Sequence, residues 1–342
     1  MLIFTLTIIT IIICYLAVVI FHPALTIKLP EIERNAKDRT IPQCRQDISF
    51  VVEDTKISAW LYLPEEIKET VPCVILNNGF GGTKDMVLEQ YALEFVKAGN
   101  AAIAYDYRYF GESDGEPRQF FNGVRRQEDL KAAINYARSH VNINPDKIIL
   151  WCTSAAGGYG INVAAEDHRI AGIIAQCPSL DHKKDDKLIF QREGIGFFLK
   201  LFIHAQRDKG RSRFGLSPHM VPIVGKSGTF AFMTAPGAYE GYTSLASESD
   251  LFINGISARS LLMLQGRNPI ETAKHVQCPV LLLVCEKDNT VSPETYLKVA
   301  EDLGEKATVI KYPIGHFDIY DGKYFEKAIT EQVKFINSIT SE

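Results

Sequence analysis

Short apolar runs alternate with longer helical patterns along most of this 342-residue chain. The apolar runs cover residues 73–76, 101–105, 147–151, 170–175, 280–284 and 308–312, and the helical patterns cover residues 84–97, 126–138, 155–165, 293–303 and 324–339. Runs that are apolar at every position are typical of strands buried on both faces, as in parallel sheets joined by crossover helices. The alternation therefore predicts an α/β fold with a mostly parallel sheet flanked by helices.

Two stretches depart from this alternation. Residues 47–52 and 56–62 alternate apolar and polar side chains, which is typical of paired strands with one solvated face. Residues 181–265 carry no parallel-strand signal and include a helix-like apolar run at 195–203. We therefore predict a core of residues 46–180 and 266–342, interrupted by an insertion at 181–265 over one end of the sheet. A cap over an active site is one interpretation of the insertion, and a surface elaboration without function is the other.

The first segment of the chain is almost wholly apolar. Residues 2–21 contain no charged side chain, and twenty helical residues span about 30 Å, the thickness of the hydrocarbon core of a bilayer. A cleavable signal peptide would need a basic start and a small-x-small cleavage site, and neither is present. We expect residues 1–22 to be a membrane anchor or uncleaved signal, followed by a linker at 23–45.

The charges that follow this segment predict its orientation. Five basic residues lie on its C-terminal side, namely Lys28, Arg34, Lys37, Arg39 and Arg45. The positive-inside rule then predicts a chain anchored by a single N-terminal helix with its main domain in the cytoplasm, and secretion is the alternative.

Composition excludes several classes of function. With 46% apolar and 23% charged residues and a net charge of −4, the chain is typical of a globular protein without the basic surface that binds nucleic acid. Its seven cysteines include no C-x-x-C pair, and most lie in apolar runs, which indicates buried free thiols. His182, His204 and His219 lack metal-ligand spacing, and no glycine-rich dinucleotide fingerprint follows a strand. We expect neither a metal nor a cofactor.

Ser154 follows an apolar strand-like run and is flanked by small residues. The stretch 148–158 resembles a sharp strand-to-helix turn that holds a serine out as a nucleophile, in which the residues two before and two after the serine lie close together. Cys152 and Ala156 are small, although glycine is usual at both places. The alternative is an ordinary strand–loop–helix junction in which the serine caps the helix.

Three other features also come just after predicted strands. Residues 77–82 are rich in glycine, Asp288 follows the strand at 280–284, and His316 follows the strand at 308–312. Since the carboxyl ends of parallel strands share one edge of a sheet, we expect Ser154, Asp288 and His316 to converge there. Glu286 and Asp318 are the rival acids.

Each side chain has a chemical reason to be there. A serine hydroxyl becomes a nucleophile when a base takes its proton, and neutral imidazole of His316 can do so near pH 7. The Asp288 carboxylate would orient the imidazole and stabilise its cation. The backbone N–H groups of Phe80 and Ala155 would form the oxyanion hole.

Residues 47–340 resemble the α/β-hydrolase superfamily, whose nucleophile, acid and base come in the same chain order. Residues 105–115 are similar to a D-x-R-x-x-G-x-S segment in which Asp106 and Arg108 would brace loops near the nucleophile. Residues 105–119 and 315–320 together resemble the branch that contains Xaa-Pro-dipeptidyl-peptidase-like and acetyl-xylan-esterase-like hydrolases and fungal polyketide transferases. Asn78 departs from this pattern because a histidine is usual there. The resemblance implies an α/β-hydrolase fold and hydrolysis or transfer of an acyl group.

We therefore predict a serine hydrolase that cleaves a carboxylic ester or thioester of a small molecule through an acyl-enzyme on Ser154. An acyltransferase of the polyketide type, using the same three residues, is the alternative. Apolar side chains in the insertion either line a pocket for a lipophilic acyl group or only seat the insertion on the core. They are Phe190, Phe197, Phe198, Leu199, Leu201 and Phe202.

Overall fold

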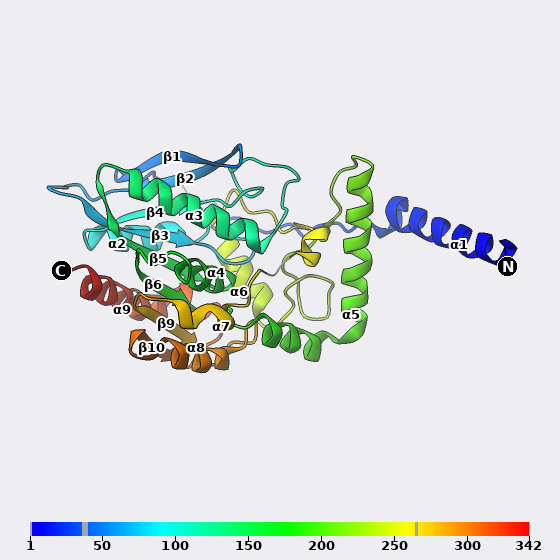
Figure 1. The fold of residues 1–342 in the computed structure, drawn as a ribbon. Coiled ribbons are helices and arrows are strands. Elements are labelled where there is room, and N and C mark those ends of the chain that lie inside the picture. The colour runs from blue at the N-terminus through cyan, green and yellow to red at the C-terminus, as the bar shows by residue number, and fades with distance from the viewer. Residues whose placement is uncertain (1, 36–39, 264–265, 342) are drawn as a thin grey trace.

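The computed structural model describes residues 2–35, 40–263 and 266–341, and within them eight strands form one sheet in the order β1-β2-β4-β3-β5-β6-β9-β10 (Figure 1). The strands are β1 (Arg45–Val52), β2 (Thr55–Tyr62), β3 (Val71–Asn77), β4 (Ala101–Tyr105), β5 (Ile143–Thr153), β6 (Ile170–Gln176), β9 (Val280–Cys285) and β10 (Ala307–Tyr312). β2 is antiparallel to both of its neighbours, and all other pairs are parallel. The mostly parallel sheet predicted from the apolar runs is confirmed.

Helices cover both faces of this sheet. The helices α3 (Gly123–Ser139), α4 (Ala155–Ala164) and α8 (Tyr296–Leu303) contribute to one apolar cluster, and α2 (Leu88–Lys97) and α9 (Gly322–Thr340) contribute to a second. The central strands are buried at nearly every position because each of their faces packs against one cluster.

Two helices begin later than their periodicity predicts. α2 begins at Leu88 and not at residue 84, because residues 84–87 form a turn that ends with Val87 at φ 54°. α8 begins at Tyr296, after a 3₁₀ turn over Pro293–Thr295. In both cases the chain first completes a loop at the carboxyl edge of the sheet.

The predicted insertion is mainly helical. It contains α5 (His182–Arg213), α6 (Ala238–Ala246), and a short antiparallel pair, β7 (Met220–Val221) with β8 (Ile256–Ser257). α5 bends at Gly194, where φ is 71°, and its second half stands at one end of the molecule (Figure 1). The predicted range 181–265 also contains a 3₁₀ helix over Ala258–Leu262, and α7 (Pro269–Thr272) follows it.

The apolar N-terminal segment forms α1 (Leu2–Phe21), which is long and apolar enough to cross a membrane by length and composition. It extends from α5 away from the sheet (Figure 1). The connector that follows packs against the insertion, since Leu29 touches Gly255 and the Asn35 amide bonds to the carbonyl of Ser247 at 3.0 Å. The basic residues Lys37 and Arg39 lie outside the described residues.

Candidate active site

Ser154 lies in a tight turn between β5 and α4. Its backbone takes φ 55° and ψ −124°, and its amide donates to the carbonyl of Gln176 at the end of β6, at 2.9 Å. Such angles are strained for a residue with a side chain and persist only where the surrounding structure enforces them. A Cβ on Gly160 would lie 2.7 Å from Sγ of Cys152, so the glycine in α4 leaves the room that this thiol fills. Gly160 thereby accommodates the departure from glycine at position 152.

Ser154, His316 and Asp288 lie in a hydrogen-bonded series. The Nε2 atom of His316 is 3.0 Å from Oγ of Ser154, and its Nδ1 atom is 2.5 Å from Oδ2 of Asp288. The other oxygen of Asp288 accepts from the amides of Thr290 and Val291 at 2.8 and 3.1 Å, which fixes the carboxylate. The series can pass the serine proton to a base whose cation is stabilised by a carboxylate.

The two rival acids point elsewhere. Glu286 pairs with Lys311 at 3.3 Å, and both side chains are exposed. Asp318 accepts from the amide of Gly315 at 2.8 Å and thereby shapes the turn that carries His316. Asp288 is therefore the acid that the structure brings to the imidazole.

The environment of His316 favours its protonated form. Burial alone would lower the pKa of His316, but the charge and hydrogen bond of Asp288 outweigh burial and raise this pKa to about 9. The Nε2 atom is free to accept the serine proton only above that pKa, so the base becomes competent as the pH rises.

The glycine-rich loop at residues 78–86 lies directly against Ser154. A Cβ on Gly79 would lie 3.0 Å from Cβ of Ser154. Asn78 shapes the loop, because its oxygen accepts from the Gly79 amide at 2.8 Å and its nitrogen donates to the carbonyl of Thr83 at 2.8 Å. Asn78 therefore has a structural task of its own at the position where the resemblance led us to expect histidine.

The candidate oxyanion donors are two backbone amides beside the serine. Within the described residues the amide of Phe80 donates to no other group, while its carbonyl accepts from the hydroxyl of Tyr242 at 2.7 Å. Ala155 is the first residue of α4, where amides have no partner within the helix. Both amides can therefore donate to an oxygen held above Ser154.

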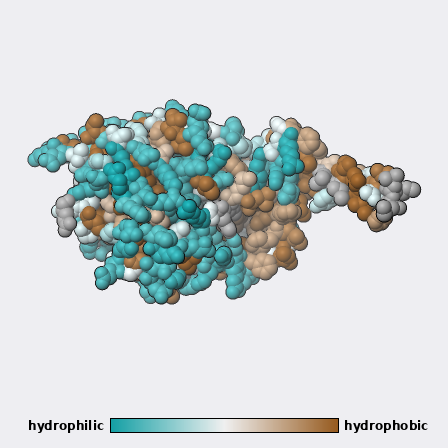
Figure 2. Space-filling model, viewed as in Figure 1, coloured by the Kyte–Doolittle hydropathy of each residue, from teal (hydrophilic) through white to brown (hydrophobic). Residues whose placement is uncertain are grey.

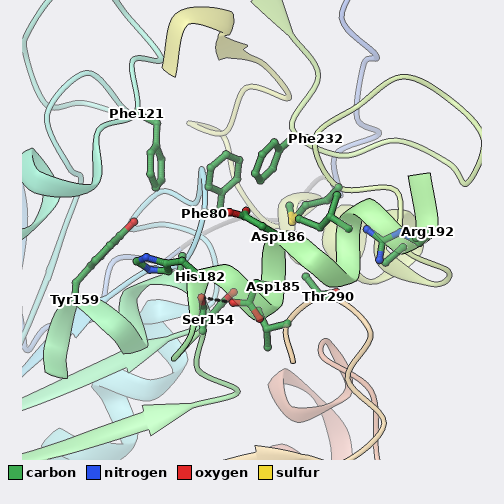
Figure 3. Close-up of a pocket in the computed structure, with 16 residues that line it drawn as sticks. Phe80, Phe121, Ser154, Tyr159, His182, Asp185, Asp186, Arg192, Phe232 and Thr290 are labelled. Carbon is green, nitrogen blue, oxygen red and sulfur yellow. Dashed lines mark hydrogen bonds between the residues drawn. The ribbon is translucent and has the colours of Figure 1, made fainter. Parts of the chain in front are cut away.

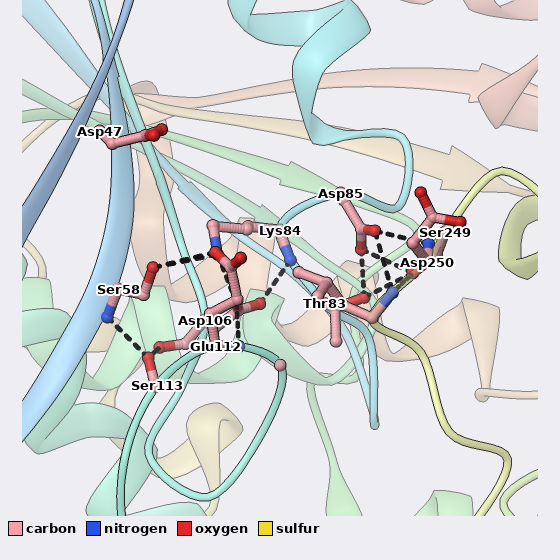
Figure 4. A network of polar contacts seen from close by, with 12 residues as sticks. Asp47, Ser58, Thr83, Lys84, Asp85, Asp106, Glu112, Ser113, Ser249 and Asp250 are labelled. Carbon is pink, nitrogen blue, oxygen red and sulfur yellow. Dashed lines mark hydrogen bonds and ion pairs between the residues drawn. The ribbon is translucent and has the colours of Figure 1, made fainter. Parts of the chain in front are cut away.

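Two neighbouring side chains fix this loop from opposite sides (Figure 4). The buried ammonium of Lys84 pairs with Asp106 at 2.7 Å and with Glu112 at 2.6 Å. The carboxylate of Asp85 accepts from the hydroxyl of Ser249 at 2.6 Å and from the amide of Asp250 at 2.8 Å. The first cluster joins the loop to the segment after β4, and the second joins it to the insertion.

Replacing Lys84 with methionine is expected to destabilise the protein by about 3–5 kcal/mol, because the fully buried Asp106 carboxylate would lose its charge partner. Urea unfolding in detergent micelles measures the loss. Lys131→Met is the matched control, since Lys131 pairs with Glu166 in an exposed site and should contribute less than about 1 kcal/mol. Equal losses in the two variants would contradict this account of the Lys84 cluster.

A cavity of about 120 Å³ lies over Ser154. One wall is aromatic, with the ring of Phe80 4.6 Å from that of Phe121 and 4.3 Å from that of Phe232 (Figure 3). The other side is polar and comes from the first half of α5, including His182 and Asp185 (Figure 3). The pocket can thus hold an apolar group and a polar group on opposite sides of the serine.

Burial perturbs both polar side chains of this pocket. It raises the pKa of Asp185 to about 6, despite hydrogen bonds from the Ser179 hydroxyl at 2.6 Å and the Ser292 amide at 2.7 Å. It also lowers the pKa of His182 below its ordinary value. Perturbed groups facing a cavity are typical of functional sites.

Sequence reasoning missed Tyr242, Asp185 and Asp85. Each belongs to a segment without a recognisable motif, and each reaches the site through tertiary contacts.

The three histidines of the insertion do not form one cluster, since only His204 and His219 touch, at 2.8 Å. Among the described residues, no group of three or more side chains could hold a metal ion.

Comparisons with known proteins agree with the fold described above. The family model described as serine aminopeptidase, S33 matches residues 68–214. The quorum-quenching protein AidA of Acinetobacter baumannii is 38% identical over 87% of this chain and 96% of its own length, and the thiohydrolase aneE of Aspergillus aculeatus is 24% identical over 86% and 93%. The crystal structure of the α/β hydrolase GrgF from Penicillium superposes with a TM-score of 0.74 at 24% identity, covering 88% of this chain and 100% of GrgF.

Proposed function

The chain belongs to the α/β-hydrolase superfamily, in the branch that includes the fungal polyketide transferases, and from this premise we propose that it cleaves a carboxylic ester or thioester through an acyl-enzyme on Ser154. The observation that carries the proposal is the hydrogen-bonded series from Ser154 through His316 to Asp288. The amides of Phe80 and Ala155 beside the serine support it further.

In the first half of the reaction, His316 Nε2 takes the proton of Ser154 as Oγ bonds to the carbonyl carbon of the substrate. The carbonyl oxygen becomes an oxyanion and accepts from the amides of Phe80 and Ala155. When the tetrahedral intermediate collapses, the bond from the acyl carbon to the leaving oxygen or sulfur breaks. The imidazolium gives its proton to the leaving alcohol or thiol, and the acyl group stays on Ser154.

In the second half, water takes the place of the leaving group. His316 accepts one proton of the water as its oxygen attacks the acyl carbon, and it returns that proton to Ser154 when the second intermediate collapses. The products are a carboxylic acid and the free enzyme. Asp288 stabilises the imidazolium in both halves.

Hydrolysis of p-nitrophenyl butyrate in water enriched in oxygen-18 tests this proposal. We expect p-nitrophenol and butyric acid in equal amounts, with one oxygen of the acid derived from the solvent, because water resolves the acyl-enzyme. Mass spectrometry of the acid measures the incorporation. No turnover of this ester or of a matching thioester would contradict the proposal.

Acyl transfer to an alcohol or amine is the second candidate, and the relatives named polyketide transferases favour it. The chemistry at Ser154 is the same, except that the acceptor replaces water in the second half. Offering a series of alcohols and amines to the acyl-enzyme separates the two reactions. Formation of free acid alone with every acceptor would exclude the transferase.

We also propose that α1 anchors the protein in a membrane, with the basic residues after it and the hydrolase domain in the cytoplasm. We propose separately that the insertion caps the active site, because the α5 residues Asp185 and Ile189 line the pocket over Ser154. Co-flotation of the full chain with lipid vesicles is the result that an anchor requires, and recovery at the bottom of the gradient would contradict it.

A further inference from the structure

The second half of α5 exposes an apolar surface where a surface helix is normally polar. Phe197, Leu201 and Ala205 face the interior and are buried. On the opposite side, Ile195, Leu199 and Phe202 are 61%, 56% and 54% exposed, and we call these three residues the outer stripe. Their spacing of four and three residues places them on one face of the helix. Two apolar faces on one surface helix indicate a second apolar environment beside the protein.

The outer stripe lies at the end of the molecule from which α1 leaves. Figure 2 shows apolar surface over the part of α5 nearest its bend, on the side of α1. Leu262, which lines a cavity together with Phe202 of the outer stripe, is also more than two-fifths exposed. The apolar area is therefore a patch and not an isolated side chain.

A second, apolar cavity lies between this patch and the pocket over Ser154 and shares wall residues with that pocket. The cavity has a volume of about 530 Å³ and is lined mainly by α5 and the 3₁₀ helix after β8. Ile189, Asp186 and Phe232 line both this cavity and the pocket over Ser154. The half-exposed Phe202 and Leu262 also line it, so it opens at the patch. An apolar chain bound in the cavity could reach Ser154 from that opening.

α1 is attached directly to the same helix. The buried guanidinium of Arg207 donates to the carbonyls of Val19 and Ile20 at 2.7 and 3.1 Å, which are among the last carbonyls of α1. The rings of Phe21 and Phe214 lie 5.3 Å apart. α1 runs away from the sheet and across the direction of α5 (Figure 1). If α1 crosses a bilayer, the second half of α5 therefore lies along the membrane surface.

The charges on this half of α5 suit the surface of an anionic bilayer. Between residues 194 and 216 the chain carries five basic residues and one acid, Asp208. Asp208 is fully buried and pairs with Arg259 at 2.7 Å, so it adds no negative charge to the surface. Among the basic residues, Lys200, Lys209 and Arg213 are exposed. Basic side chains beside an apolar face are typical of helices that lie in a membrane interface.

We propose that the outer stripe of α5 is embedded in the bilayer surface and that the cavity beneath it takes the long acyl chain of a membrane-resident ester or thioester from the lipid to Ser154. The membrane contact stands on the exposure, attachment and charge of α5. The substrate class rests on the proposed acyl hydrolysis at Ser154.

Fluorescence quenching by brominated lipids tests the membrane contact. The full chain carries two native tryptophans, and the variant Leu199→Trp adds one in the outer stripe. Leu297→Trp is the matched control, because Leu297 is also a helical leucine, 60% exposed, on α8. In vesicles of phosphatidylcholine and phosphatidylglycerol with brominated chains, the emission added by Leu199→Trp should lose most of its intensity, and that added by Leu297→Trp should not. An equal loss of emission from the tryptophans at both positions, or no loss from either, would overturn the proposal.

Chain-length selectivity tests the cavity. We expect kcat/KM for p-nitrophenyl esters to rise about threefold to fourfold for each methylene added beyond butyrate, until the cavity is filled. Ile189→Trp, at the junction of pocket and cavity, should lower the ratio of decanoate to butyrate kcat/KM by roughly tenfold or more. Turnover without any dependence on chain length would contradict the cavity and leave the hydrolase intact. Absence of turnover with every ester would contradict the hydrolase, while the quenching result would still decide the membrane contact.

Discussion

Replacing Ser154 with alanine is expected to lower kcat for p-nitrophenyl butyrate by on the order of 10⁶, because the proposed acyl-enzyme forms on the hydroxyl that this change removes. The residual rate would come from substrate binding and from the amides of Phe80 and Ala155. Stopped assays with high enzyme concentration measure both rates. Among the residues that the structure describes, the hydroxyl makes one hydrogen bond, to His316 at 3.0 Å, so the thermal midpoint of unfolding should change little.

Ser244→Ala is the control for this loss, since Ser244 is an exposed serine on α6. It should retain full activity when it is prepared in the same way. A Ser154→Ala variant that kept more than about a tenth of the parent rate would contradict the assignment of the nucleophile, because even the loss of one oxyanion donor costs about 100-fold or more.

Asp288→Asn is expected to lower kcat by about 10⁴ at neutral pH. The amide can occupy the same space, but it carries no charge to stabilise the imidazolium, and it can donate to Nδ1 and so leave the proton on Nε2. With that proton in place, the imidazole cannot accept the proton of Ser154. The same ester assay measures this loss.

The pH profile separates this role of Asp288 from a structural one. In the parent, kcat/KM should rise with pH as His316 loses its proton, with the midpoint near the raised pKa of about 9. Asp288→Asn removes the charge that raises this pKa and leaves the burial that lowers it. The midpoint should therefore move to lower pH while the plateau falls. A lower plateau with an unmoved midpoint would contradict the charge interaction.

The rival acids provide matched controls for Asp288. Glu286→Gln and Asp318→Asn remove one carboxylate each from the same region, and neither carboxylate touches His316. Each should change kcat by less than about tenfold, since exposed charges act weakly at a distance. A loss in either variant as large as that in Asp288→Asn would contradict the choice of acid.

The sheet could be predicted from the sequence because its strands are apolar at every position, which is a local property. The convergence of Ser154, Asp288 and His316 could be expected for a topological reason, since all three follow parallel strands that end at one edge. The partners of the loop at residues 78–86 could not be predicted. Tyr242 and Asp85 act through contacts between segments about 160 residues apart, and no periodicity records such pairs.

The predicted first residues of α2 and α8 were wrong because loop geometry overrides helical periodicity there. Residues 84–87 have the composition of a first helical turn, yet Lys84 and Asp85 are held in buried ion-pair and hydrogen-bond clusters, so α2 begins only after them. The second half of α5 is recognisably apolar in the sequence, but its apolar pattern does not indicate which of its residues face the core. Exposure of Leu199 and burial of Leu201 depend on how the helix docks.

The central claim is that Ser154 is the activated nucleophile of an acyl-transfer site, and reaction with a fluorophosphonate tests it most directly. Intact mass spectrometry of the full chain should give one phosphonyl adduct, and peptide mapping should place it on Ser154. Labelling should be lost in Ser154→Ala and become much slower in His316→Ala, because the attacking hydroxyl needs its base. An unmodified protein, or an adduct on a different residue, would contradict the account.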